Sequence, residues 1–219
     1  MAKISLNIVC RNEEQRIRAC ILDAAPWVDE VIVADQSSED ATPKIVREIV
    51  APCPVRLIST KSYGYCEATR NVAAHHSTGD WLLILDADEL MTPRLKYALR
   101  WLAETAPQSV DGWKLRRELW MDGEMAFAGD EHLRFARRDR VRFLDEPHTE
   151  PQALDWSRIR SLEYISIFHW KTTAEQLADE HRCEDVLARF PFRNETLRSQ
   201  KLALNVRLAE ARKAGTEPP

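Results

Sequence analysis

The stretch WLLILDADEL, residues 81–90, joins five apolar residues directly to three carboxylates, Asp86, Asp88 and Glu89. The apolar run is typical of a strand that is covered on both faces. Burying an unpaired carboxylate is costly, so the three acids must lie at a surface or in a cleft and meet a positive charge. The stretch therefore predicts a buried strand that ends at a polar site.

Three earlier segments, residues 4–9, 30–35 and 55–59, are similar short runs rich in Ile, Val and Leu. Between them, apolar residues recur at helical spacing, as in the set Ile17, Cys20, Ile21 and Ala24 and the stripe Ile45, Val46, Ile49 and Val50. This alternation predicts an α/β fold, a mostly parallel sheet with helices on both faces. Ligands of such sheets bind at the carboxyl edge of the strands, which is where the three acids lie.

Punctuation residues place the ends of several elements. Thr42-Pro43 and Thr92-Pro93 each fit a helix N-cap followed by a first-turn proline. After about residue 110, apolar and charged residues alternate, which predicts half-exposed antiparallel strands with a turn at Asp122-Gly123. From Thr172 the pattern is helical. We therefore expect a first half over 1–110, a second half of the same domain over 111–171, and a helical segment over 172–219.

Composition restricts the class of protein. The 219 residues, 44% of them hydrophobic, suffice for one well-filled core, and the formal charge of -4 without a dense basic block argues against a nucleic-acid partner. The five cysteines are odd in number and form no C-x-x-C pair, which argues against a disulfide frame or a zinc site. No apolar run reaches the length of a signal-peptide core or of a membrane span, so we expect a cytoplasmic protein.

Asp86 and Asp88 are separated by one residue. In an extended segment their side chains would point to the same side, and such a pair suits Mg²⁺ or Mn²⁺, which also leave positions open for phosphate oxygens. The alternative is a carboxylate pair at the N-terminus of the helix that follows Thr92, where the helix dipole favours anions. The residues alone leave both interpretations open.

Polar groups also follow the other predicted strands. Asp35 could accept a hydrogen bond from a base or a ribose, or could be a turn residue that bonds its own backbone near Ser37 and Ser38. Arg70 offers a guanidinium fork that matches phosphate oxygens, and its alternative is a surface ion pair.

The segments ISLNIVCRNEEQRIRACILDAAPWVDEVIVADQSSEDAT (4–42) and GYCEATRNVAAHHSTGDWLLILDADEL (64–90) together resemble family-2 glycosyltransferases of the GT-A fold. They are most similar to the small bacterial type related to lipopolysaccharide-core glucosyltransferases. The resemblance runs from about residue 4 to 95, with weaker echoes to about 170. One departure is DQSSED (35–40), where relatives usually have DSGSTD.

The resemblance implies roles for individual residues. Asn12, Glu13 and Asp35 would line the nucleoside pocket, and Arg70 would lie near the base or the diphosphate. Asp86 would reach the ribose or the metal, and Asp88 would be the main protein ligand of Mn²⁺ or Mg²⁺.

On the acceptor side the resemblance implies a carboxylate base, for which we favour Asp130 over Glu131. Each could instead be a turn residue or a strand-edge charge. His148, in DEPHTEP (145–151), would approach the metal or the leaving diphosphate, or would be a hydrogen-bonded loop histidine. His169 is expected to be a packed strand residue.

The activity implied is an inverting, metal-dependent transfer of a sugar from a nucleotide-diphosphate donor, most of all a UDP-sugar, to a hydroxyl of a glycan or lipid-linked glycan, as in lipopolysaccharide synthesis. Residues 1–110 would bind the nucleotide-sugar and residues 111–171 the acceptor. Helices within 172–219 would be a solvated face or would contact a membrane surface peripherally. The alternative is a module that binds a nucleotide or a partner without catalysis. A D-x-D-x-T phosphatase is disfavoured by Leu90, and a nucleotidyltransferase by the lack of glycine in CRNEEQ.

Overall fold

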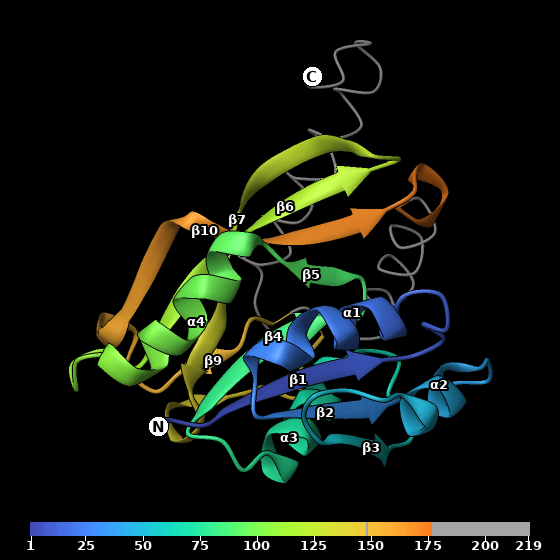
Figure 1. Ribbon diagram of the computed structural model, residues 1–219, viewed down its shortest axis with the longest axis horizontal. Coiled ribbons are helices and arrows are strands. Elements are labelled where there is room, and N and C mark those ends of the chain that lie inside the picture. Colours follow the sequence, from blue (N-terminus) through green and yellow to red (C-terminus); the bar gives the residue numbers. More distant parts are fainter. Residues whose placement is uncertain (148, 177–219) are drawn as a thin grey trace.

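The computed structural model describes residues 1–147 and 149–176 and contains an eight-stranded sheet in the order β3-β2-β1-β4-β7-β6-β10-β5 (Figure 1). Its strands are β1 (Ile4–Cys10), β2 (Glu30–Asp35), β3 (Val55–Ser59), β4 (Trp81–Asp86), β5 (Glu89–Met91), β6 (Gly112–Met121), β7 (Glu124–Arg137) and β10 (Ile159–Lys171). A small separate ladder pairs β8 (Val141–Arg142) with β9 (Gln152–Ala153). The predicted α/β fold is confirmed.

The first four strands of the order, β3 to β4, are parallel, as predicted. The apolar residues of α1 (Ile17–Ala24), α2 (Thr42–Glu48) and α4 (Pro93–Thr105) join one large cluster on one face of the sheet. Helix α3 (Glu67–His76) packs on the other face, against β1 and β2. Single 3-10 turns occur at η1 (Ala25–Trp27), η2 (Arg138–Arg140) and η3 (Trp156–Arg158).

The second half of the sheet is mixed. Strand β7 runs antiparallel to β4 and β6, and β10 is parallel to β6 and antiparallel to β5. The hairpin turn predicted between β6 and β7 is confirmed: Asp122 and Gly123 have φ values of 50° and 93°, the positive pair that a two-residue type I′ turn needs. Strand β5 was not predicted, because it has only three residues and begins within the acidic stretch, at Glu89.

An aromatic stack joins the two halves of the sheet. Trp81 of β4 stacks on Trp113 of β6 and Phe135 of β7, with ring centroids 5.1 and 5.0 Å away. Trp81 and Phe135 are at most 1% exposed, so the stack seals the centre of the core at the junction. The carboxyl end of β4 is thereby fixed relative to β7.

The two predicted helix caps differ. Thr92 caps α4 by accepting a hydrogen bond from the Leu95 backbone N–H at 3.3 Å, as predicted. Thr42 is instead the first residue of α2, and its Oγ1 accepts from the Glu13 backbone N–H at 2.7 Å. The N-cap of α2 is Ala41, which makes no side-chain cap bond, so the cap prediction was wrong by one residue. The Thr42 N–H donates to Asp40 Oδ1 at 2.9 Å. Helix α2 also ends at Glu48, before the last two members of the predicted stripe.

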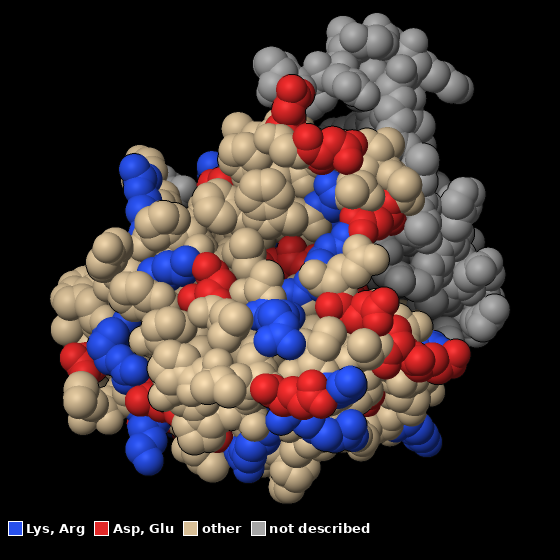
Figure 2. Space-filling view, turned by 45° about the vertical axis from the view of Figure 1, so that its right-hand side comes forward, with Lys and Arg blue, Asp and Glu red and all other residues tan. Residues whose placement is uncertain are grey.

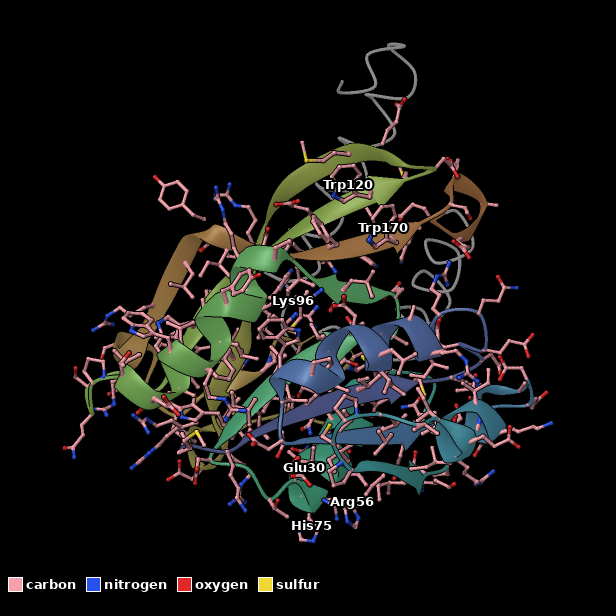
Figure 3. The ribbon with its side chains drawn as sticks, in the orientation of Figure 1. Glu30, Arg56, His75, Lys96, Trp120 and Trp170 are labelled. Carbon is pink, nitrogen blue, oxygen red and sulfur yellow. The ribbon has the colours of Figure 1, made fainter. Side chains whose placement is uncertain are left out.

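Buried polar groups tie the amino end of the sheet together. Glu30, on β2, accepts hydrogen bonds from Ser5 Oγ at 2.6 Å and Arg56 Nη2 at 2.9 Å (Figure 3). Of the helices among the described residues, none is long and apolar enough to span a membrane. The predicted helical segment lies outside the described residues from position 177 onward.

Candidate functional site

Asp86 is the last residue of β4 and lies between two arginines from other elements. Arg70, from α3, donates through Nη2 to Asp86 Oδ1 at 2.5 Å, and Arg134, from β7, donates through Nη2 to Oδ2 at 3.2 Å. Both arginines are buried, at 9% and 7% exposure. The positive charge that the acidic stretch requires is therefore supplied by the protein itself at this position.

Glu89 is the most buried member of the same cluster. It is fully buried, accepts from Arg134 Nη2 at 2.8 Å, and uses its second oxygen to accept from the Asp86 backbone N–H at 2.8 Å. One arginine thus serves two carboxylates, and the turn between β4 and β5 is closed by the side chain of Glu89.

Asp88 has a different set of partners. Residues 87 and 88 form a turn, so the extended geometry predicted for Asp86 and Asp88 is not observed. Asp88 Oδ2 lies 2.9 Å from His169 Nε2 and 3.8 Å from Lys171 Nζ, both on β10. The Asp88 carbonyl also accepts from the Trp170 backbone N–H at 3.0 Å. These contacts anchor the turn to the second half of the sheet.

Electrostatics keeps both aspartates ionised. Burial by itself would raise the pKa of Asp86, but the charges of Arg70 and Arg134 outweigh it and hold the pKa well below its usual range. For Asp88, burial is likewise outweighed, by the hydrogen bond and charge of His169 and by the charge of Lys171, so its pKa is also lowered. Asp86 and Asp88 are therefore ionised at neutral pH, and each lies beside basic side chains.

The structure also bears on the helix-cap interpretation of the carboxylates and on the ion-pair interpretation of Arg70. The carboxylates do not cap α4, whose N-cap is Thr92. Arg70 is buried in an ion pair rather than lying in a surface pair, and its Nη1 is buried without a hydrogen-bond partner among the described residues. Buried guanidinium N–H groups are normally bonded, so this atom is suited to an incoming acceptor such as a phosphate oxygen.

Asp35 ends β2 at the same edge of the sheet and is 2% exposed. Its Oδ2 accepts from the Ser38 backbone N–H at 3.1 Å, and its Oδ1 accepts from Ser38 Oγ. This is the turn arrangement that the sequence left open as the alternative. Contact between Asp35 and a base stays a prediction, and it requires this carboxylate to exchange a partner.

The loop after β1 is tied to the loop after β2. Asn12 has a φ of 58°, donates its backbone N–H to Ser38 Oγ at 2.8 Å and accepts through Oδ1 from the Glu39 N–H at 2.9 Å. Glu13 lies beside Arg16, with 3.6 Å between Oε2 and Nη1. Asn12 and Glu13 therefore lie in the loop after β1, next to the carboxyl edge of the parallel strands.

The acceptor-side residues are described only in part. Asp130 and Glu131 both lie within β7, and the side chain of Asp130 is outside the described part of the structure, as is His148 entirely. Glu131 Oε2 accepts from Ser161 Oγ at 2.6 Å. Their proposed roles as base and metal neighbour stay predictions.

A second imidazole–carboxylate pair, in addition to His169 and Asp88, is formed by His132 of β7. His132 Nδ1 is 2.7 Å from Glu150 Oε1. Burial tends to raise the pKa of Glu150, but the hydrogen bond and charge of His132, with Lys114 and Arg134, hold it below its usual value. Arg134 thus links the electrostatics of this pair to that of Asp86.

Thiol chemistry at this edge is disfavoured. Cys66 precedes α3 and accepts a weak hydrogen bond from Arg70 Nη2 at 3.6 Å. Burial raises its pKa to about 12, and it also raises the pKa values of Cys10 and Cys20. These thiols stay protonated at neutral pH and are not nucleophiles.

Asp88 and His169 offer one donor pair for a divalent cation at the end of β4. An oxygen and a nitrogen 2.9 Å apart can both approach one ion, and Mg²⁺ and Mn²⁺ readily take their remaining ligands from phosphate and water. Among the described residues, no group of three or more His, Cys, Asp or Glu could hold a metal. The donor set fits a cation that arrives with a phosphate ligand.

Two central residues were missed by sequence reasoning. Arg134 lies in an alternating strand with many arginines, and nothing in the sequence distinguishes it from Arg137 or Arg138. His169 was expected to be a packed strand residue; it is 8% exposed on β10, but it also contacts Asp88. The signal available was its neighbour Lys171, which places a second basic residue on the same side of the strand.

Charges on the visible surface are mixed. Figure 2 shows acidic and basic residues interspersed over one face, without a broad patch of a single sign. This agrees with the mild net charge of -4.

The architecture corresponds to that of known GT-A proteins. TarS of S. aureus, in a crystal structure with UDP, superposes with a TM-score of 0.59 over 89% of this chain and 68% of that chain, at 15% identity. At this identity the likeness concerns the fold alone. A second crystal structure of S. aureus TarS, residues 1–349, gives a TM-score of 0.58 at 16% identity over 89% of this chain and 68% of that chain.

The family follows from the sequence match. Residues 5–151 match the model of glycosyl transferase family 2, so the chain belongs to that family. A TPR repeat-containing protein of Synechococcus elongatus is 40% identical over 89 residues, 41% of this chain and 21% of the relative. An uncharacterized glycosyltransferase of Rickettsia typhi is 33% identical over 102 residues, 47% of this chain and 33% of the relative. The chain thus spans a third or less of the length of these two curated relatives.

Proposed function

We propose that the protein transfers a sugar from a nucleotide-diphosphate donor to a hydroxyl acceptor, with inversion at the anomeric carbon and with Mn²⁺ or Mg²⁺. The observation that carries the proposal is the pair of carboxylates after β4, which have different partners. Asp86 is held between two buried arginines, and Asp88 pairs with His169. Membership of glycosyl transferase family 2 supports it.

Donor binding would use the same groups. Arg70 and Arg134 hold the Asp86 carboxylate at the end of β4, where it would accept from ribose hydroxyls. The unpartnered Nη1 of Arg70 would donate to a diphosphate oxygen. TarS was crystallised with UDP and with UDP-GlcNAc, so a UDP-sugar is the first donor to test.

Asp88 and His169 would hold the cation, which, when bound, supplies Lewis-acid stabilisation of the leaving diphosphate. Lys171, 3.8 Å from the Asp88 carboxylate, adds a positive charge on the same side. Asp130 would remove the proton of the acceptor hydroxyl, with Glu131 as the second candidate. The acceptor would be a glycan or lipid-linked glycan, as in lipopolysaccharide synthesis, and the reaction would take place in the cytoplasm, with peripheral membrane contact through the C-terminal segment.

The test compares Asp88→Asn and His169→Gln with wild type in Mn²⁺-dependent hydrolysis of UDP-sugars. Loss of a metal ligand should reduce kcat/KM by about a hundredfold or more and should raise the Mn²⁺ concentration needed for half-maximal rate. Asp139→Asn is the matched control, because Asp139 is 72% exposed on η2. Wild-type turnover and metal dependence in Asp88→Asn would refute the metal assignment.

Donor binding and turnover are measured separately on the same samples. A thermal-shift panel of UDP, GDP and CDP, with and without Mn²⁺, reports binding. Stabilisation by a nucleotide without any donor hydrolysis would support the alternative, a binding module without catalysis. Asp130→Asn should retain nucleotide binding and lower the transfer rate by about a hundred- to ten-thousandfold.

A further inference from the structure

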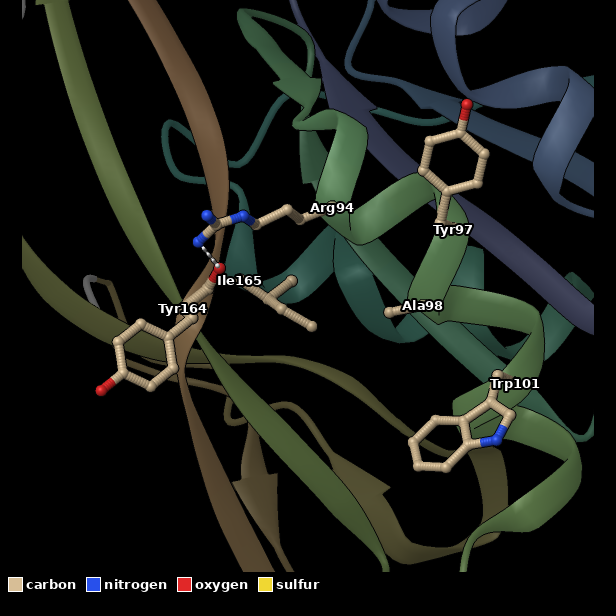
Figure 4. Close-up of a pocket in the computed structure, with 6 residues that line it drawn as sticks. All are labelled: Arg94, Tyr97, Ala98, Trp101, Tyr164 and Ile165. Atoms are coloured by element: carbon tan, nitrogen blue, oxygen red, sulfur yellow. Dashed lines mark hydrogen bonds between the residues drawn. The ribbon is translucent and has the colours of Figure 1, made fainter.

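A groove between α4 and β10 carries three exposed aromatic side chains. Tyr97 and Trp101 project from α4 and Tyr164 projects from β10, and they are 78%, 64% and 77% exposed (Figure 4). Ala98 and Ile165 point toward one another between α4 and β10, in a hollow of about 490 Å³ that the three aromatic residues border. A group of large aromatic side chains that are this exposed is typical of a surface that binds a ligand or a partner.

A second hollow, of about 420 Å³, continues from the first and shares Arg94 and Tyr164 with it. Its lining is more polar and includes Thr92, Arg116, Glu118 and Ser166. The two hollows together, hereafter the α4–β10 groove, therefore have an aromatic end and a hydrogen-bonding end.

The hydrogen-bonding end has an excess of positive charge. The Nε of Arg116 is buried and has no hydrogen-bond partner among the described residues. The Glu118 carboxylate accepts from Ser166 Oγ at 2.6 Å, and Arg94 Nη1 donates to the Tyr164 carbonyl at 3.3 Å. Within the described chain, neither arginine forms an ion pair. Among the residues that line this hollow, two arginines are therefore accompanied by one carboxylate, Glu118. Such a pair of forks is complementary to a phosphate or a carboxylate.

The groove is separate from the Asp88 site. Side chains alternate along β10, and His169 and Lys171 contact Asp88 from one side of the strand. Ser166 and Phe168 line the groove from the other side. On that same side Trp170 stacks on Trp120, with 5.6 Å between ring centroids (Figure 3). Phe168 packs edge-on against Trp120, with 5.9 Å between centroids.

We infer that the α4–β10 groove binds an anionic saccharide, a sugar that bears a phosphate or a carboxylate. The C–H face of a pyranose packs against aromatic rings, and the tips of Tyr and Trp hydrogen-bond to its hydroxyls. The anionic group is received by Arg94 and Arg116. The inference rests on the proposed function, since an enzyme that elongates a glycan can hold a charged part of its acceptor away from the reacting hydroxyl. A lipid surface fits less well, because the hollow continues to the Glu118 carboxylate.

The first experiment follows the indole N–H resonance of Trp101, assigned with Trp101→Phe, during titration of the full chain. The probes are glucose 6-phosphate, glucose and inorganic phosphate. We expect glucose 6-phosphate to bind at least about tenfold more tightly than either fragment, because only it engages both ends of the groove. Equal binding of glucose, or no change in the Trp101 signal, would overturn the inference.

Two variants test the two ends. Arg116→Gln should weaken binding of glucose 6-phosphate by about tenfold or more, and Arg116→Lys by less, since it keeps the charge but loses the fork. Tyr164→Ala should weaken it about fivefold. Arg117→Gln, one position along β6, is the matched control, because Arg117 lines neither hollow. Melting temperatures equal to wild type establish that each variant is folded, and unchanged affinity in folded Arg116→Gln would refute the site.

Two further measurements separate the possible failures. UDP binding and donor hydrolysis are measured on the same variants, and both should equal wild type. If UDP does not bind the wild type while the Trp101 titration succeeds, the proposed function fails and the saccharide site stands. If vesicles with anionic lipid shift the Trp101 resonance and glucose 6-phosphate does not, the groove is a membrane contact and the inference is overturned.

Discussion

Arg134→Met removes the cationic partner of a fully buried carboxylate and should therefore destabilise the fold strongly. Arg134 is 7% exposed and donates to Glu89 at 2.8 Å and to Asp86 at 3.2 Å. Glu89 is fully buried, and Arg134 is its cationic partner in the described structure. Methionine retains much of the volume but removes the charge, so the Glu89 carboxylate loses its compensation.

The magnitude follows from the cost of breaking a buried ion pair. Removal of one partner typically costs about 3–5 kcal/mol, because the remaining charge is buried without a partner. Glu89→Gln should relieve part of this cost in the double variant, since a neutral amide replaces the buried carboxylate. We therefore expect the two changes to be non-additive by about 1–3 kcal/mol.

Urea unfolding of the two single variants and the double variant, followed by circular dichroism, measures this cycle. Arg140→Met is the matched control: Arg140 is 50% exposed, lies 3.6 Å from the exposed Asp139, and should contribute below about 1 kcal/mol. A loss below about 1 kcal/mol for Arg134→Met, or strict additivity in the cycle, would show that Glu89 is not held by Arg134 as described.

Two other perturbations test the surrounding structure. The lowered pKa of Asp88 means that its contribution to stability is complete above the ordinary carboxyl pKa of about 4 and is lost as the pH falls below it. Unfolding of Asp88→Asn should accordingly depend less on pH between about 5 and 3 than unfolding of wild type, and an equal slope would contradict the assignment. Gly79→Ala should cost about 1–3 kcal/mol in urea unfolding, because an added Cβ would lie 2.7 Å from the Ser5 backbone nitrogen; a variant as stable as wild type would show that β1 yields easily.

Features that depend on near neighbours in the chain were predicted from the sequence. The cap at Thr92 and the turn at Asp122-Gly123 each involve residues within three positions. The turn bonds between Asp35 and Ser38 were recognised as an alternative for the same reason. Thr42 was misplaced because its hydroxyl bonds to Glu13, 29 residues away, where no local pattern applies.

The sequence by itself determined the parallel half of the sheet, its helical layers and the position of three carboxylates at the end of β4, because apolar periodicity and turn chemistry act over a few residues. Only the tertiary structure decided which groups meet those carboxylates. Arg134 is 48 residues from Asp86, and His169 is 81 residues from Asp88. Side chains so distant in the chain come together only after strand order and register are set, and in β7 and β10 these depend on pairing across the whole sheet.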